Sequence, residues 1–435
     1  MVGDLARAID AWVAAHRLRA MSLLAAAGLG LVMACGQLAR VPDLVRAPRA
    51  FLVLFALTFL AYAIGAVVAA RCSDRVTVLV VLAVALAARL VMLPVSPSLS
   101  TDAYRYVWDA RVATAGIDPY AYPPVAAEVA PLRDATIFPQ LNHTTWQTVY
   151  PPLAQAFFRA VYRMVPDSVL AMKLALGIAE LVALLALGVL LATVRVPLGR
   201  LAIYAWNPLV LVEIWGSGHL DALVIAAVTL AALASARRRD SLAAIFLGIG
   251  TLVKVYPAVL FLLLPGRRRP PVALAFAAVI VLGTLATGGF GHWPIVPIGR
   301  YVAEEYFNPG LVRSVVNDPS LALAATALWV ALAAWRAGPG SLAERAVPLV
   351  AGFVVLAPNV FPWYVLWLVP FLAVTPSVPW IAFTGAVALS YSFFLSEPWG
   401  IPLWARLAQL APLATAVLLR WRWRPRTYPA TVETA

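Results

Sequence analysis

The chain has 435 residues, of which 63% are hydrophobic and only 12% are charged, and its formal net charge is +13. Apolar runs of about 20 residues, the length needed to cross roughly 30 Å of hydrocarbon, recur from one end to the other. The arginines lie in short loops and at helix ends, which argues against nucleic-acid binding and favours anionic lipid or a phosphate-bearing lipid substrate. We therefore predict an all-α polytopic membrane protein that forms one domain over residues 1–435.

The N-terminal segment is basic and leads into an apolar run at 21–38. This run is too long for a cleaved signal sequence and lacks a clear cleavage site, so we predict a retained membrane helix. The two cysteines, Cys35 and Cys72, lie in or beside apolar runs without metal-ligand spacing. The sequence therefore predicts no metal, no disulfide framework and no cofactor.

Apolar windows along the chain predict about 12 transmembrane helices. They lie near 21–38, 50–70, 76–94, 168–194, 200–216, 219–236, 271–290, 319–336, 342–358, 361–375, 378–395 and 400–419. Two shorter apolar pieces, 151–165 and 241–265, remain to be assigned.

The distribution of basic residues predicts the topology, because cytoplasmic loops carry the excess of Arg and Lys. Cytoplasmic positions are indicated by Arg7, Arg17, Arg19, Arg71 and Arg75 and by the tail RWRWRPR at 420–426. Both termini are then cytoplasmic, and the third helix delivers residues 95–150 to the periplasm as a first large loop. Residues 291–317 form the second.

Segment 241–265 is flanked by arginine triplets at 237–239 and 267–269, so a single span would leave one triplet on the outer face. A re-entrant hairpin removes this conflict, with its tip at LVKVYP, where Pro257 breaks the helix and Lys254 lies within the membrane. Segment 151–165 is then an interfacial helix on the outer surface. In the competing topology both segments span the membrane.

The stretch LSTDAYRYVWDARVATAGIDPYAYPP, residues 99–124, interrupts the apolar pattern at the start of the first outer loop. A helix that begins after Thr101 would carry Asp102, Arg105, Tyr106 and Asp109 on one face and Tyr104, Trp108 and Arg111 on the other. The alternative is a solvated amphipathic helix that caps the bundle, with Asp102 favoured by the helix dipole.

Other polar groups are predicted at the same depth. GSGHLDA at 216–222 places His219 and Asp221 at an outer turn, and TVYPPLAQ presents Tyr150 before the surface helix. An ionisable residue within the membrane is a functional candidate by default, which applies to Lys254 and to Arg89, although Arg89 could instead snorkel to the interface. These groups together predict one polar pocket at the outer surface.

One carboxylate with several fixed cations fits the transfer of a sugar from a lipid phosphate. A phosphate leaving group needs no protonation at neutral pH, so an inverting transfer requires one base for the acceptor hydroxyl and cations for the departing phosphate.

Four stretches, in this order, resemble the polyprenol-phosphate-sugar-dependent glycosyltransferases of the GT-C superfamily, closest to the mannosyltransferases of glycosyltransferase family 87. They are TDAYRYVWDARVATAGIDPYAYPP, TVYPPLAQ, YAWNPLVLVEIWGSGHLDAL and GTLVKVYPAVLFLLLP, within residues 101–265. The resemblance implies a GT-C-type fold in which Asp102 is the catalytic base. It also implies that Lys254, with arginines of the first loop, holds the donor phosphate. Asp221 occupies the place of an acidic residue that binds a divalent metal in some members, but we expect no metal here.

The remaining candidate roles follow from the same reading. Arg105 and Arg111 join Lys254 as candidates for the donor phosphate and sugar. Tyr104, Tyr106, Tyr150 and Tyr256 are expected to shape the sugar pocket, with His219 and Asp221 as secondary candidates.

The chain also departs from the family pattern. Actinobacterial members carry a histidine pair in a late Pro- and Trp-rich stretch, whereas APNVFPWYVLW at 357–367 has none. This departure leaves the subfamily and the identity of the sugar open. His292 in GFGHWP either replaces that function or anchors the loop at the interface.

The expected function is an inverting glycosyltransferase of a bacterial inner membrane, with a periplasmic active site. Its donor would be a polyprenyl-phosphate sugar, which the resemblance implies is mannose, and its acceptor a hydroxyl of a glycan, glycolipid or protein. The alternative is a transporter or flippase of a lipid-linked sugar, which predicts inverted repeats and paired broken helices. The sequence shows one broken element, at 252–257. A purely structural membrane subunit is a third class, but it would not need acid, base and cation together.

Overall fold

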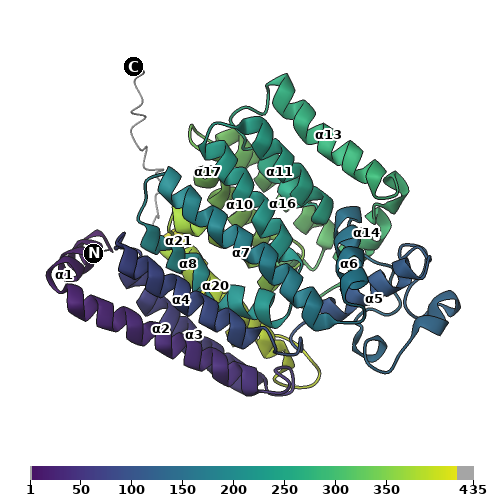
Figure 1. The fold of residues 1–435 in the computed structure, drawn as a ribbon, viewed down its shortest axis with the longest axis horizontal. Coiled ribbons are helices and arrows are strands. Elements are labelled where there is room, and N and C mark those ends of the chain that lie inside the picture. The colour runs from purple at the N-terminus through teal and green to yellow at the C-terminus, as the bar shows by residue number, and fades with distance from the viewer. Residues whose placement is uncertain (1, 419–435) are drawn as a thin grey trace.

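The computed structural model describes residues 2–418, which are helical with irregular connections (Figure 1). Within this range the β pairing is limited to an isolated bridge between Pro309 and Asn359. The predicted all-α class is therefore confirmed. The basic tail at 420–426 lies outside the described residues, so its part in the topology stays a prediction.

The N-terminal third begins with α1 (Val2–Ala15) and continues with three long apolar helices. These are α2 (Arg17–Arg40), α3 (Pro48–Ala69) and α4 (Arg75–Met92). Helix α2 packs on both α3 and α4, and the three lie side by side in Figure 1. Asp74 caps α4 by accepting a hydrogen bond from the Thr77 amide, and Arg17 of α2 pairs with the same carboxylate.

The first long loop carries α5 (Asp102–Thr114), the 3₁₀ turns η1 (Ala127–Leu132) and η2 (Phe138–Gln140), and α6 (Pro152–Met164). Helix α6 begins with Pro152 at its first position, where the missing amide proton costs nothing. It corresponds to the helix predicted at 151–165, and it packs against α5 (Figure 1).

The centre of the bundle contains α7 (Val169–Thr193), α10 (Asp221–Ala236), α11 (Asp240–Val253) and α13 (Pro270–Ala286). Helix α10 packs against α7 and α11, and α13 covers α11 from outside (Figure 1). After α11 the chain breaks at Lys254 and continues as α12 (Pro257–Phe261). A Cβ atom on Gly266 would lie 2.4 Å from the Asp240 carboxylate. The two ends of segment 240–266 therefore meet, as the hairpin prediction requires.

The predicted helix at 200–216 is not continuous. It consists of η3 (Leu198–Arg200), α8 (Leu201–Ala205), α9 (Pro208–Val210) and the π-helical turn η4 (Leu211–Gly216). The break has a local cause, because Pro208 has no amide proton and the Asn207 side chain accepts from the Leu209 amide instead.

The C-terminal part is also more interrupted than predicted. It contains η5 (Phe290–His292), α14 (Ile295–Glu304), α15 (Leu311–Val316), α16 (Pro319–Arg336), α17 (Leu342–Leu356), α18 (Pro362–Val365), α19 (Val369–Val374), α20 (Val378–Ala386), η6 (Val387–Phe394) and α21 (Leu403–Leu418). The predicted helix at 361–375 is split into α18 and α19, and η6 continues α20 as a 3₁₀ helix.

Five of the described helices are long and apolar enough to cross a membrane: α2, α3, α4, α7 and α16. A sixth span is obtained if α13 and the segment Phe290–Glu304, which are bent by 89°, are taken together. Helices α10 and α11 are apolar but shorter, and proline breaks divide several others. The structure therefore contains several helices that could cross a membrane, while the number of about 12 stays a prediction.

Arg89 does not snorkel to an interface. Its side chain is fully buried, with Nε 2.9 Å and Nη2 2.6 Å from the two carboxylate oxygens of Glu180. Trp215 donates a hydrogen bond to the same carboxylate at 3.0 Å. This paired charge joins α4, α7 and η4 inside the bundle, so Arg89 has a structural partner rather than a place in a pocket.

Candidate active site

A cavity of about 660 Å³ opens where the two long loops meet the broken helices. Its wall is lined by some of the residues in five segments: 98–105 and 142–151 of the first loop, 298–307 of the second, 253–256 at the hairpin tip and 357–367 of the Trp-rich stretch. The structure brings five of the predicted site residues to this wall: Asp102, Arg105, Tyr150, Lys254 and Tyr256. A concave site with aromatic walls and a few polar groups is typical of small-molecule binding.

Asp102 is the first residue of α5, and its half-buried side chain faces the cavity. The partial positive charge of the helix N-terminus favours a carboxylate here. Asn142 Nδ2 donates a hydrogen bond to Asp102 Oδ1 at 2.9 Å. Among the described residues the structure records no side-chain partner for Oδ2, so this oxygen is available to a ligand.

Arg105 is buried, and two contacts fix its guanidinium at the cavity wall. Its Nε lies 2.8 Å from Asp109 Oδ1, and Nη2 donates to the Trp146 carbonyl at 3.0 Å. Gln155 of α6 donates to the other oxygen of Asp109 at 2.8 Å. Helix α6 therefore sets the orientation of the cation through Asp109.

Lys254 stands at the hairpin tip, directly after α11. Its Nζ lies 3.0 and 3.1 Å from the two oxygens of Asp221, which is fully buried at the start of α10. The same ammonium group lies 4.6 Å from the ring centre of Tyr364 and 5.2 Å from that of Trp367. Trp367 also donates to Asp221 and stacks on Tyr256 at 3.9 Å. Lys254 is thus a fixed but still accessible cation.

Four other predicted residues lie behind this wall or beside it, outside the cavity lining. Asp221 contacts Lys254, Tyr106 stacks on Phe158 at 4.4 Å, and His219 stacks on Trp363 at 4.1 Å. Tyr104 is half-buried on α5, and its partial burial raises the pKa of its hydroxyl. These residues support the wall and do not reach into the cavity.

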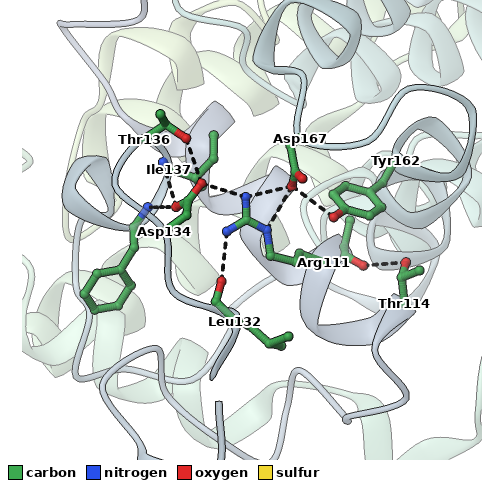
Figure 2. A network of polar contacts seen from close by, with 10 residues as sticks. Arg111, Thr114, Leu132, Asp134, Thr136, Ile137, Tyr162 and Asp167 are labelled. Carbon is green, nitrogen blue, oxygen red and sulfur yellow. Dashed lines mark hydrogen bonds and ion pairs between the residues drawn. The ribbon is translucent and has the colours of Figure 1, made fainter. Parts of the chain in front are cut away.

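Arg111 lies in a separate network within the first loop (Figure 2). Its guanidinium contacts Asp167 at 2.7 Å, Asp134 at 3.0 Å and the Leu132 carbonyl at 3.0 Å. Burial alone would lower the pKa of Arg111, but the hydrogen bonds with Asp134 and Asp167 raise it above its usual value. The hydrogen bond from Arg111 in turn holds the pKa of Asp134 well below its usual range. The structure therefore does not bring Arg111 to the cavity, contrary to the expectation that it contacts the donor.

His292 also lies outside the cavity lining. Its Nδ1 lies 2.7 Å from the Gly288 carbonyl, and Nε2 lies 3.3 Å from Asp118 of the first loop. Its ring also contacts Tyr120. This geometry fits a contact between loops rather than a group that faces a substrate.

Sequence reasoning missed several residues of the wall, above all Asn142, His143, Tyr301 and Glu305. The cluster NHTTW at 142–146 carried a signal, because it places an amide, an imidazole and an indole just before the TVYPP motif. Glu305 carried none, because its partner His143 is 162 positions away in the chain. In the part of the chain that the structure describes, no group of three or more His, Cys, Asp or Glu side chains is placed to hold a metal ion.

The apolar helical bundle and its cavity, which combines carboxylates, cations and aromatic rings, define a membrane protein with a binding site for a polar ligand. Residues 1–266 match the model of the MptA/B family, described as the N-terminal domain of alpha-(1->6)-mannopyranosyltransferases, and the chain belongs to this family. No curated protein matches the chain. The protein is therefore a glycosyltransferase acting on mannose, which confirms the resemblance found in the sequence.

Proposed function

We propose that the protein transfers mannose, with inversion, from a polyprenyl-phosphate donor to a hydroxyl of a glycan acceptor. We place the reaction at the periplasmic face of the inner membrane and in a GT-C-type fold. The observation that supports this most directly is that Asp102, Arg105 and Lys254 line one cavity. One carboxylate with a free oxygen and two fixed cations are what the reaction requires.

In the proposed step, Asp102 accepts the proton of the acceptor hydroxyl as its oxygen attacks the anomeric carbon. The bond between that carbon and the phosphate oxygen breaks, and the electron pair leaves with the polyprenyl phosphate. Lys254 and Arg105 stabilise the negative charge of the departing phosphate. The leaving group needs no proton, so a single base suffices.

The wall near Lys254 also fits the lipid part of the donor. Val253 and Val255 flank Lys254 in the chain and line the cavity, and Val255 is 46% exposed. Phe353, which also lines the cavity, lies 6.1 Å from the ring centre of Tyr256. An apolar polyprenyl chain would be accommodated along these side chains, with its phosphate at Lys254. The family name specifies an α-linked product, so transfer with inversion requires a donor in which mannose is β-linked to phosphate.

The charge distribution supports a periplasmic cavity. Asp221 and Lys254 lie at one end of α10 and α11, and the arginine triplet at 237–239 lies at the other end. Because cytoplasmic ends carry the excess of arginine, the cavity end would face the periplasm.

The test is the transfer of labelled mannose by purified protein in detergent, wild type beside Asp102→Asn. The donor is a short-chain β-linked polyprenyl-phosphate mannose, and the acceptor is an α-(1→6)-linked dimannoside with an octyl chain. We expect Asp102→Asn to lower kcat by about 10²- to 10⁴-fold while donor binding is kept. Asp118→Asn is the matched control, because Asp118 lies in the same loop but outside the cavity lining.

Near-normal transfer by Asp102→Asn would refute its role as the base. Tight donor binding without turnover in the wild type, with mixed lipid and glycan acceptors offered, would instead favour the transporter.

A further inference from the structure

The cavity contains a carboxylate that the proposed step does not use. Glu305 follows the last residue of α14 in the second loop, and its side chain is 14% exposed. Of the residues that line the cavity in the described structure, only Glu305 and Asp102 carry a carboxylate. Glu305 Oε2 lies 3.0 Å from His143 Nε2, so the pair joins the second loop to the first at the cavity wall.

The backbone of Glu305 is held firmly. Its carbonyl accepts hydrogen bonds from Arg313 Nη1 at 2.7 Å and from Asn359 Nδ2 at 2.9 Å. The Tyr306 amide donates to Oε1 at 3.1 Å. With His143 on the other oxygen, two of the roughly four lone-pair positions of the carboxylate are used. Among the described residues the structure records no further partner for this carboxylate, so the remaining positions can accept hydrogen bonds from hydroxyl groups in the cavity.

Aromatic rings surround this carboxylate. The His143 ring stacks on Trp146 at 4.2 Å and 16°, and Tyr301 stands perpendicular to Trp146 at 6.2 Å and 87°. Phe361 lies against Tyr301 at 6.0 Å. A carboxylate beside aromatic faces suits a sugar ring, because the hydroxyls donate to the oxygens while the apolar C–H face packs on a ring.

The charge of Glu305 favours a different ligand from the charges of the phosphate site. The cations at Lys254 and Arg105 attract a phosphodiester, whereas the carboxylate of Glu305 repels one. The cavity, at about 660 Å³, has room for more than one sugar ring. The Glu305 carboxylate therefore fits the hydroxyl groups of a neutral ligand better than it fits a phosphate.

We propose that Glu305, oriented by His143, determines specificity for the acceptor sugar by accepting hydrogen bonds from its hydroxyls. This inference rests on the proposed function, since it divides the cavity into a donor part and an acceptor part. Glu305 is a binding residue here, and Asp102 remains the base.

The test compares Glu305→Gln and His143→Phe with wild type, using the same donor and octyl dimannoside. We expect Glu305→Gln to raise the KM for the acceptor 10- to 100-fold, because a hydrogen bond to a charged group is lost. His143→Phe keeps the stacking on Trp146 and should raise this KM less. The donor dissociation constant should change by less than about twofold in both. The control is Glu304→Gln, because Glu304 is a half-exposed neighbour outside the cavity lining that pairs with Arg300.

Three results would overturn the inference. An unchanged acceptor KM in Glu305→Gln would remove Glu305 from the binding site. If Glu305→Gln raised the KM for the donor and not for the acceptor, Glu305 would bind the donor. If it abolished kcat at saturating acceptor, Glu305 would be the catalytic base.

Acceptor binding without donor provides a readout that is independent of transfer. Titration of the octyl dimannoside, followed by tryptophan fluorescence, should show weaker binding to Glu305→Gln than to wild type. If the wild type binds the dimannoside but transfers no mannose, the proposed function fails and this titration still decides the role of Glu305. Equal binding by the two proteins would overturn the inference.

Discussion

The pair formed by Lys254 and Asp221 allows the electrostatic design of the site to be tested quantitatively. Asp221 is fully buried, and its carboxylate contacts Lys254 Nζ with both oxygens and Trp367 with one. Lys254→Met preserves the packing of the side chain at position 254. It leaves the buried carboxylate of Asp221 with a neutral hydrogen-bond donor, the Trp367 indole, and without its cation. Breaking a buried ion pair in this way costs about 3–5 kcal/mol.

Asp221→Asn should cost less. The side chain of Lys254 is 21% exposed, and its ammonium group retains the cation–π contacts with the rings of Tyr364 and Trp367. Water can therefore solvate this charge when Asp221 becomes neutral. Loss of the charged hydrogen bond then costs about 1.5–3 kcal/mol. The double variant Lys254→Met/Asp221→Asn leaves no isolated charge and should be more stable than Lys254→Met alone.

The assay is a double-mutant cycle in detergent, with thermal unfolding and donor binding measured for all four proteins. Donor binding should weaken about 10- to 150-fold in Lys254→Met and should fall no further in the double variant, because Asp221 acts through Lys254. Arg46→Met is the control, because Arg46 is largely exposed and its loss should cost less than about 1 kcal/mol. Strictly additive effects on both stability and donor binding would refute the reasoning.

Two further predictions concern charges outside the cavity. Arg89→Met should destabilise the protein by about 3–5 kcal/mol in thermal unfolding, because it leaves the Glu180 carboxylate buried without a cation, and Arg89→Met/Glu180→Gln should recover part of this loss. If the double variant recovered no stability, the unpaired Glu180 carboxylate would not be the cause of the loss. The contact of Asp134 with Arg111 lowers the pKa of Asp134, so its stabilisation is present above about pH 4 and is lost as pH falls through the lowered folded-state pKa. Because the Asp134 side chain is 31% exposed, solvent screens the contact and the effect should stay below about 1 kcal/mol. Arg111→Met should reduce it in thermal unfolding measured from pH 6 to pH 3, while the hydrogen bonds from Thr136, Ile137 and Phe138 preserve the rest.

The sequence by itself indicated the features that depend on local chemistry. Apolar windows predicted the long helices because burying a helix in hydrocarbon requires a continuous run of apolar side chains. Pro257 indicated the break after Lys254, and Asp102 was recognised at a helix start, because both effects act within one turn of the chain. The same reasoning overestimated helix continuity at Pro208, where Asn207 caps a new helix.

Only the tertiary structure decided which polar residues share the cavity. Helix α5 is buried on all sides from Arg105 to Val112, so hydrophobic periodicity could not distinguish Arg105, which lines the cavity, from Arg111, which binds Asp134 and Asp167. The partners that fix the site are also remote in sequence: Asn142 is 40 positions from Asp102, and Asp221 is 33 from Lys254. Such contacts depend on how the helices and loops pack, and packing leaves no periodic signal along the chain.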